Sequence, residues 1–314
     1  MLWSIMMPVY NPEASYFRMA LESVLKQDQG TERMQVEVVD DCSPSVDVRS
    51  LVGLFGKDRI KYSRTPTNLG LHGCWNFCIN KAEGDWVHLF HQDDLVIDGF
   101  YRALEKAFKS SASIGAAFCR HAISDGDGHW LELSRLHRRE AGIIPDFGGI
   151  IGEGQHIQTP SIVVRRATYD KVGPYRSDLA YTLDWEMFQR IAANFDIWFE
   201  PQILAVWRKH VVSETARLAG NGKLGSDYLK VFSLTKEYYK KYPQLLRISK
   251  EEHSKVVALE AKKLLVAGKM PEAFQEMRAS LRLGQTKAKY SRLCDFYSLL
   301  LRIHLSKAKR ALCE

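Results

Sequence analysis

Short apolar runs alternate with helical spacing in the first half of the chain. Residues 12–25 and 68–82 place apolar side chains three and four positions apart, which is typical of helices packed on one face. Asn11 is predicted as the N-cap of the first helix, and Pro12 as its first helical residue. Strands alternating with helices indicate an α/β fold, with a mostly parallel sheet flanked by helices. The predicted strands cover residues 3–7, 36–39, 60–63 and 85–90.

The regular alternation weakens in the second half. Apolar runs at 115–119, 162–164 and 197–199 predict more strands, and residues 185–193 predict a helix. The glycine-rich stretch 142–154 predicts a mobile loop. From about residue 227 the pattern is helical, with two helices joined by a tight turn at Gly268. We therefore expect an α/β domain over residues 1–220 and a helical region over residues 221–314.

Composition narrows the class of protein. Of the 314 residues, 46% are hydrophobic and 26% are charged, which is typical of globular proteins. The net charge of +7 favours anionic partners, but no nucleic-acid recognition motif accompanies the basic residues, so we expect no nucleic-acid partner. Six scattered cysteines predict reduced thiols in a cytosolic protein. The chain lacks a signal-peptide pattern and a bilayer-length apolar segment, so a soluble or peripheral protein is expected.

Two pairs of carboxylates follow predicted strands. Asp40 and Asp41 come after one strand, and Asp93 and Asp94 come after another. In open α/β sheets, ligands bind outside the carboxyl ends of the strands, so the two pairs are expected to converge on one crevice. Each pair also has a simpler interpretation, because aspartate commonly caps helices and begins turns.

Five short motifs resemble, in order, the signature of family-2 glycosyltransferases with the GT-A fold. The resemblance runs through about the first 215 residues. It implies a nucleotide-sugar donor, with a divalent cation, Mn²⁺ or Mg²⁺, held on the diphosphate by a strand-end Asp-x-Asp motif. The motifs are Met7–Pro12, Val38–Ser43, Asn68–Leu71, Trp75–Asn76 and His91–Asp94.

The resemblance places Asp93 at the metal-binding position and Asp94 as its supporting neighbour. A leaving nucleoside diphosphate gains negative charge, and a hard cation held by carboxylates neutralises it. The first aspartate of the family motif is His91 here, so weaker metal affinity is expected. The segment from residue 207 to 215 resembles the family's His-x-x-Ser-x-Thr motif. By that resemblance His210 would bind the metal or the diphosphate, and Arg208 would add positive charge.

By the same resemblance, residues at the strand ends would hold the nucleotide. Tyr10 has a ring for stacking and a hydroxyl for hydrogen bonding, and Asp41 would bond the base or ribose. Ordinary packing explains Tyr10 alone about as well, and Asn76 on a helix is often only solvated. The predicted nucleotide-binding set is Pro8, Tyr10, Asn11, Asp41, Asn76, His91 and Gln92.

The segment from residue 182 to 190 resembles the family's acidic segment beneath the acceptor site. In inverting members its carboxylate, here Asp184, removes the proton from the attacking hydroxyl. Asp184 is also predicted as the N-cap of the following helix, which is compatible with a base. The family usually has glutamate where Leu183 stands, so support is expected from Glu186. Arg190 is a candidate for pairing with a carboxylate or phosphate, and solvation is its alternative.

Together the motifs predict an inverting, metal-dependent glycosyltransferase that moves a sugar, from a UDP-sugar, to a saccharide or lipid-linked saccharide in cell-surface polysaccharide synthesis. His91 and Leu183 motivate an alternative, a non-catalytic nucleotide-sugar-binding GT-A protein. A dinucleotide-dependent oxidoreductase needs a Gly-x-Gly-x-x-Gly motif that the first strand lacks. The basic, leucine-rich stretch 290–312 predicts either peripheral contact with the cytoplasmic face of a membrane or a packed bundle helix.

Overall fold

The computed structural model describes residues 2–210, 213–284 and 287–311. The chain divides into two compact units, which we call the sheet unit and the helical unit. The sheet unit comprises Met1–Ile151, Gln155–Asp178 and Met187–His210, and the helical unit comprises Gly152–Gly154, Leu179–Glu186 and Val211–Glu314. The helical unit includes two short segments from the first 186 residues, so the two units are not continuous in sequence. The predicted domain boundary after residue 220 therefore stays a prediction.

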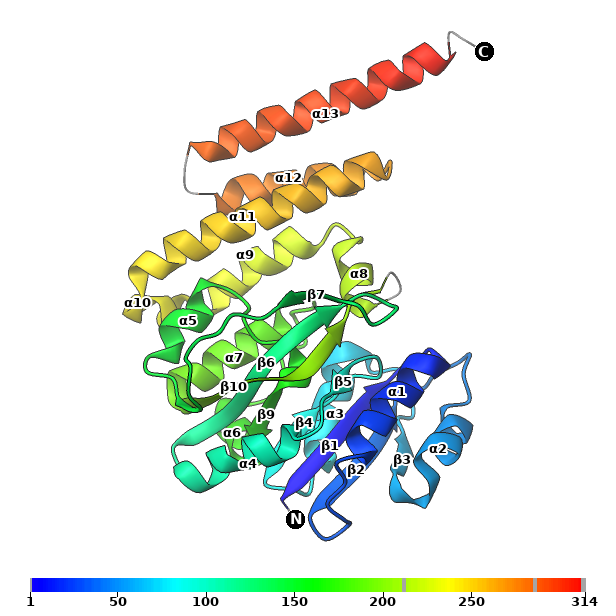
Figure 1. The fold of residues 1–314 in the computed structure, drawn as a ribbon. Coiled ribbons are helices and arrows are strands. Elements are labelled where there is room, and N and C mark those ends of the chain that lie inside the picture. The colour runs from blue at the N-terminus through cyan, green and yellow to red at the C-terminus, as the bar shows by residue number, and fades with distance from the viewer. Residues whose placement is uncertain (1, 211–212, 285–286, 312–314) are drawn as a thin grey trace. The chain divides into compact units, whose positions relative to one another are not determined.

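Ten strands of the described chain form one mixed sheet, in the order β3-β2-β1-β4-β9-β6-β10-β5, with β7 paired to β6 and β8 to β10 (Figure 1). Strands β3, β2, β1 and β4 are parallel, and β9 is antiparallel to both β4 and β6. The strands are β1 (Trp3–Val9), β2 (Met34–Asp40), β3 (Lys61–Arg64), β4 (Trp86–Leu89), β5 (Leu95–Val96), β6 (Ile114–Ser124), β7 (Trp130–Leu133), β8 (Gly142–Ile143), β9 (Ile162–Arg165) and β10 (Asp196–Arg208).

Burial explains why these segments become strands. Every residue of β2 is buried, and β1 is buried except for the half-buried Pro8, as expected for parallel strands covered on both faces. The aromatic side chains Trp3, Phe17, Trp86 and Phe100 join the aliphatic residues in one core. The flanking helices of the sheet unit are α1 (Ala14–Leu25), α2 (Val48–Gly56), α3 (Gly70–Lys81), α4 (Phe100–Ser110) and α6 (Arg166–Val172).

Two local predictions are wrong. Helix α1 begins at Ala14, and its N-cap is Glu13, whose side chain accepts a hydrogen bond from the Tyr16 amide. Asn11 has a left-handed φ of 42° and belongs to the loop before the helix. The glycine-rich stretch 142–154 contains β8 and helix α5 (Phe147–Glu153), because the apolar residues between its glycines, among them Ile151, are buried.

The helical unit contains the C-terminal helices, and the helical pattern predicted there is confirmed. Gly268, with a φ of 79°, lies in the turn between α11 and α12. Ala261, Leu265, Met277 and Phe296 pack α11, α12 and α13 into a second core. The helices are α8 (Glu214–Ala219), α9 (Leu224–Leu234), α10 (Lys236–Lys241), α11 (Pro243–Val266), α12 (Met270–Leu283) and α13 (Ala288–Ala311), and α7 (Leu183–Asn194) begins among its residues.

The structure bears on two further predictions, which concern membrane-spanning segments and the cysteines. None of the described helices combines the length and apolar character needed to cross a lipid bilayer. Leu312, at the end of the predicted basic helix, lies outside the described residues, as does Cys313. The other five cysteines, Cys42, Cys74, Cys78, Cys119 and Cys294, are free thiols, in agreement with the prediction.

Candidate functional site

The carboxyl ends of β1, β2 and β4 bring three of the predicted motifs to one edge of the sheet. Val9 pairs with Asp40, and the Asp41 amide donates to the Val9 carbonyl at 2.8 Å. The Phe90 amide donates to the Met6 carbonyl at 3.0 Å, so the chain leaves β4 beside the end of β1. The residues that follow these strands therefore lie together, as the sequence pattern predicts.

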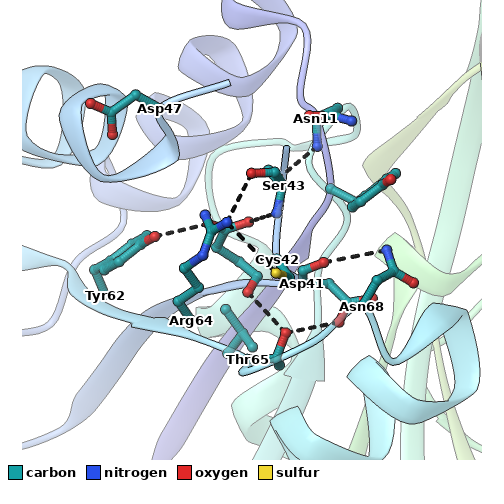
Figure 2. A network of polar contacts seen from close by, with 12 residues as sticks. Asn11, Asp41, Cys42, Ser43, Asp47, Tyr62, Arg64, Thr65 and Asn68 are labelled. Atoms are coloured by element: carbon teal, nitrogen blue, oxygen red, sulfur yellow. Dashed lines mark hydrogen bonds and ion pairs between the residues drawn. The ribbon is translucent and has the colours of Figure 1, made fainter. Parts of the chain in front are cut away.

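Tyr10 and Gln92 bond each other across this edge. The Tyr10 amide donates to Gln92 Oε1 at 2.8 Å, and Gln92 Nε2 donates to the Tyr10 carbonyl at 3.3 Å. The Tyr10 side chain is 46% exposed. Asn11 turns toward the loop after β2: its amide donates to Ser43 Oγ at 2.9 Å, and the Ser45 amide donates to Asn11 Oδ1 at 3.1 Å (Figure 2). The motif Met7–Pro12 is thus bonded both to the motif His91–Asp94 and to the loop after β2, and Tyr10 is exposed.

The buried carboxylate of Asp41 holds the loop that leads into α3. Oδ1 accepts Thr65 Oγ1 at 3.0 Å (Figure 2). Oδ1 also accepts the Leu69 amide at 2.8 Å, and Oδ2 accepts the Gly70 amide at 3.0 Å. Gly70 begins α3, so Asp41 satisfies amides at a helix N-terminus that lack intrahelical partners. Both oxygens are engaged by the loop, and a direct contact between Asp41 and a nucleotide stays a prediction.

Asp93 and Asp94 face different partners. Asp93 Oδ2 lies 2.8 Å from His210 Nε2, and the two side chains are 20% and 10% exposed. Asp94 is buried and accepts the Arg208 amide at 3.0 Å through Oδ1. Its Oδ2 lies 3.5 Å from His91 Nδ1. Burial raises the pKa of the Asp94 carboxyl above its ordinary value, because a charged carboxylate loses its hydration there.

Strand β10 brings Arg208 and His210 to Asp93. It pairs with β5, and Val206 lies opposite Leu95 just after the acidic motif. The buried Arg208 donates from Nε to the Asp93 carbonyl and from Nη1 to the Gly126 carbonyl, both at 3.0 Å. A residue that the sequence analysis missed, Tyr16 of α1, has its ring 4.5 Å from the Arg208 guanidinium and 5.1 Å from the His210 ring. In sequence, Tyr16 is only one more residue of an amphipathic helix.

The donor atoms fit a divalent cation. The ligand atoms of His91, Asp93 and Asp94 lie within 4.8 Å of one another. Carboxylate oxygen and imidazole nitrogen are ligands that Mn²⁺ accepts, and carboxylate oxygen is the ligand that Mg²⁺ prefers. Because Asp94 is buried against the Arg208 backbone, the more exposed Asp93 is the carboxylate best able to reach an ion, with His210 beside it.

Asp184 lies in the first turn of α7. It is not the N-cap as predicted, because α7 begins one residue earlier, at the buried Leu183, and the Glu186 amide already bonds the Thr182 carbonyl at 3.0 Å. Asp184 Oδ1 accepts the Trp185 amide at 2.7 Å. Asp184 and the buried Glu186 belong to the helical unit, whereas Asp93 belongs to the sheet unit, so the approach of Asp184 to Asp93 stays a prediction.

Two predicted polar residues hold backbone in the sheet unit. Asn76 Nδ2 donates to the Tyr175 carbonyl at 2.9 Å, and the Tyr175 amide donates to Asn76 Oδ1 at 2.8 Å. Arg190 donates to the carbonyls of residues 172–174, including that of Pro174 at 2.9 Å. These bonds fix the segment 172–175, and contact of either side chain with a phosphate or sugar stays a prediction.

Sequence comparison identifies a family and its relatives. The model of glycosyl transferase family 2 matches residues 4–173. Uncharacterized protein MT1568 of Mycobacterium tuberculosis is 28% identical over 228 residues, which cover 69% of this chain and 70% of that protein. Poly(ribitol-phosphate) beta-N-acetylglucosaminyltransferase TarS of Staphylococcus aureus is 34% identical over 97 residues, which cover 31% of this chain and 17% of TarS.

Two solved structures share the fold. TarS 1–349 in complex with UDP-GlcNAc has a TM-score of 0.69 at 18% identity, over 98% of this chain and 92% of that chain. The mannosyltransferase PcManGT from Pyrobaculum calidifontis, in complex with GDP-Man and Mn²⁺, has a TM-score of 0.57 at 15% identity, over 95% of this chain and 80% of that chain. At these identities the likeness is one of fold, and it confirms the predicted GT-A architecture.

Proposed function

Since the chain belongs to glycosyl transferase family 2 and is a glycosyltransferase, we propose that it moves one sugar from a UDP-sugar to a saccharide or lipid-linked saccharide, with inversion at the anomeric carbon. The observation that carries the proposal is the pair formed by Asp93 and His210, whose side chains meet at 2.8 Å at the carboxyl edge of the sheet. This edge is where α/β proteins bind ligands, and the pair offers a carboxylate oxygen and an imidazole nitrogen as ligands for a diphosphate-bound cation.

We assign Asp93 and His210 as the residues that would hold Mn²⁺ or Mg²⁺. A cation bound there would offset the charge that develops on the leaving UDP. Asp94 and Arg208 support the pair: Asp94 accepts the Arg208 amide, and Arg208 donates to the Asp93 carbonyl. The Mn²⁺ in the PcManGT complex supports the assignment of a cation.

We assign Pro8, Tyr10, Asn11 and Gln92 to the nucleotide pocket. The exposed Tyr10 ring can stack on a base, and its bonds to Gln92 fix its backbone. Asp41 and Asn76 would shape this pocket through the backbone they hold, and His91 would line it beside Asp93. The UDP-GlcNAc in the TarS complex supports a UDP-sugar as donor.

We assign Asp184 as the general base, on the resemblance of its segment. Its carboxylate would take the proton of the acceptor hydroxyl while the hydroxyl oxygen attacks the anomeric carbon and the bond to UDP breaks. Glu186, which is buried in the same first turn of α7, would support Asp184. Arg190 would contribute by fixing the backbone of residues 172–174.

The proposed setting is surface-polysaccharide synthesis in the cytoplasm, at the inner face of a membrane. TarS is named a poly(ribitol-phosphate) beta-N-acetylglucosaminyltransferase, and a second relative, ExoO, is named a succinoglycan biosynthesis protein. On α13, Tyr297, Leu301 and Leu305 are more than half exposed and recur four residues apart, so they share one helix face. Leu301→Asp should weaken co-sedimentation with phosphatidylglycerol vesicles, and Leu259→Asp, at an exposed position of α11, should not.

Hydrolysis of a panel of UDP-sugars by the full chain, with Mn²⁺ or with chelator, tests the function. We expect Mn²⁺-dependent release of UDP that falls about 100-fold in Asp184→Asn, with UDP binding retained. Asp93→Asn and His210→Ala should weaken UDP binding only when Mn²⁺ is present. Asp170→Asn, an exposed change on α6, serves as the control.

The same assay separates the alternative, a non-catalytic nucleotide-sugar-binding protein, which His91 and Leu183 motivate. UDP binding with no turnover of any donor would support that alternative. Absence of UDP binding under all these conditions would refute both.

A further inference from the structure

The segment that carries Asp184 is held by the helical unit. Residues Leu179–Glu186 group with the C-terminal helices, although the rest of α7 and the neighbouring strands group with the sheet. The predicted base therefore belongs to the same unit as helices α9–α13, which follow the last of the family motifs at residues 207–215.

A single carboxylate of α9 binds three successive amides of this segment. Asp227 Oδ1 accepts the Ala180 amide at 3.1 Å, and Oδ2 accepts the Tyr181 amide at 2.9 Å and the Thr182 amide at 2.7 Å. Oδ2 also accepts Thr182 Oγ1 at 2.8 Å. Asp227 is buried, so these bonds replace the hydration of its charge. Three consecutive amides aimed at one carboxylate define the backbone conformation of residues 180–182.

The residue after Asp184 is held by the same unit. The Trp185 ring stacks on His253 of α11, with centroids 4.7 Å apart, and meets Phe232 of α9 edge-on at 5.6 Å. Trp185 and Thr182 are buried, whereas Asp184 between them is half-buried. Packing on both sides of Asp184 thus leaves its backbone little freedom.

We propose that Asp227 is a positioning residue for the transfer reaction: by binding the amides of residues 180–182, it fixes the start of α7 and so the direction of the Asp184 carboxylate. The inference rests on the proposed function, in which Asp184 is the base. A base contributes only when its oxygen is held at the substrate hydroxyl, and a displacement of about 1 Å costs about 100-fold in rate. The helical unit would therefore take part in catalysis through Asp227.

The test compares Asp227→Asn with Ser280→Ala in the full chain. Ser280 Oγ donates to the Ser254 carbonyl at 2.7 Å between α12 and α11, and neither residue bonds the segment 180–182, so this control weakens the helical unit without releasing Asp184. Hydrolysis, with Mn²⁺, of the UDP-sugar that the wild type turns over fastest in the panel reports turnover, and calorimetry with UDP and Mn²⁺ reports binding. We expect Asp227→Asn to lower kcat about 100-fold, with the Kd of UDP within about twofold of wild type. Ser280→Ala should keep kcat even where it lowers the melting temperature.

A double variant shows whether Asp227 acts through Asp184. If it does, Asp184→Asn combined with Asp227→Asn should be no slower than Asp184→Asn alone. Multiplied losses in the double variant, or a wild-type kcat in Asp227→Asn, would overturn the positioning assignment. Full turnover in Asp184→Asn would instead overturn the proposed base, and the two failures are thereby distinguished.

If Asp227→Asn fails to fold, a milder variant tests whether Asp227 positions Asp184. Thr182→Val removes only the hydroxyl that bonds Asp227 Oδ2 and keeps the shape of the buried side chain. We expect kcat to fall about tenfold, with an unchanged Kd for UDP. A Thr182→Val variant with wild-type kcat would count against the proposal.

Discussion

Replacement of Asp41 by asparagine tests whether this strand-end carboxylate acts on the loop or on the nucleotide. In the structure both oxygens accept hydrogen bonds from the loop before α3, from the Leu69 and Gly70 amides and from Thr65 Oγ1. Asparagine keeps one acceptor oxygen and points an NH₂ group at a donor. At least one part-buried donor of the loop then faces this NH₂ group instead of an Asp41 oxygen.

The magnitude follows from the lost bond. A buried donor left without an acceptor costs about 1–3 kcal/mol, and loss of a charged cap is of similar size. We expect Asp41→Asn to lower the free energy of unfolding by about 2 kcal/mol. For a unit of roughly 200 residues this lowers the melting temperature by roughly 4–8 °C.

Thermal unfolding and UDP titration of the same samples provide the assay. Asp47→Asn is the matched control, because Asp47 caps the exposed start of α2 through the Ser50 amide, and asparagine caps an exposed helix about equally well. We expect Asp41→Asn to melt early and Asp47→Asn to melt with the wild type. An unchanged melting temperature together with UDP binding weakened more than about tenfold would refute the reasoning and make Asp41 a nucleotide ligand.

Three further changes have expected outcomes. Burial raises the pKa of Glu276 from 4.5 to about 7, so the contribution of this carboxyl to the stability of the helical unit should be fully present below pH 4.5 and should be lost as the pH rises through 7. Glu276→Gln should flatten this dependence of the melting temperature on pH, and an unchanged slope would contradict the assignment. Gly84→Ala would place a Cβ 2.5 Å from the backbone of β1 and should lower the melting temperature sharply, whereas Gly53→Ala, with no atom within 4 Å, should not; equal melting temperatures would refute the expected clash. Asn76→Ala removes both bonds to the Tyr175 backbone and should lower the melting temperature, with the Kd of UDP within about twofold of wild type; the reverse pattern would favour direct contact with the ligand.

Local periodicity predicts many of the strands and helices, because each depends on residues close in sequence, although α2, α4 and α6 were not among the predicted helices. The helix predicted over 68–82 is α3, Gly70–Lys81, and the predicted apolar runs lie in β1, β2, β4 and the later strands. The N-cap prediction at Asn11 was wrong because the conformation of Asn11 depends on residues far away in sequence. The bonds that hold Asn11 come from Ser43 and Ser45, more than thirty residues away, and no local pattern contains them.

The order of short motifs along the chain was enough to indicate the family and its fold, and strand-end positions were enough to nominate Asp93. Only the tertiary structure decided what each nominated side chain bonds. His210 lies beside Asp93, 117 positions away in sequence, because β10 pairs with β5. Asp41 and Asn76, in contrast, form hydrogen bonds with backbone groups of their own unit. Asp227 carries no motif, and its bonds to residues 180–182 exist only in the folded helical unit. The physical reason is that element type follows from the spacing of neighbouring side chains, whereas a hydrogen-bond partner is chosen by distances between atoms far apart in the chain.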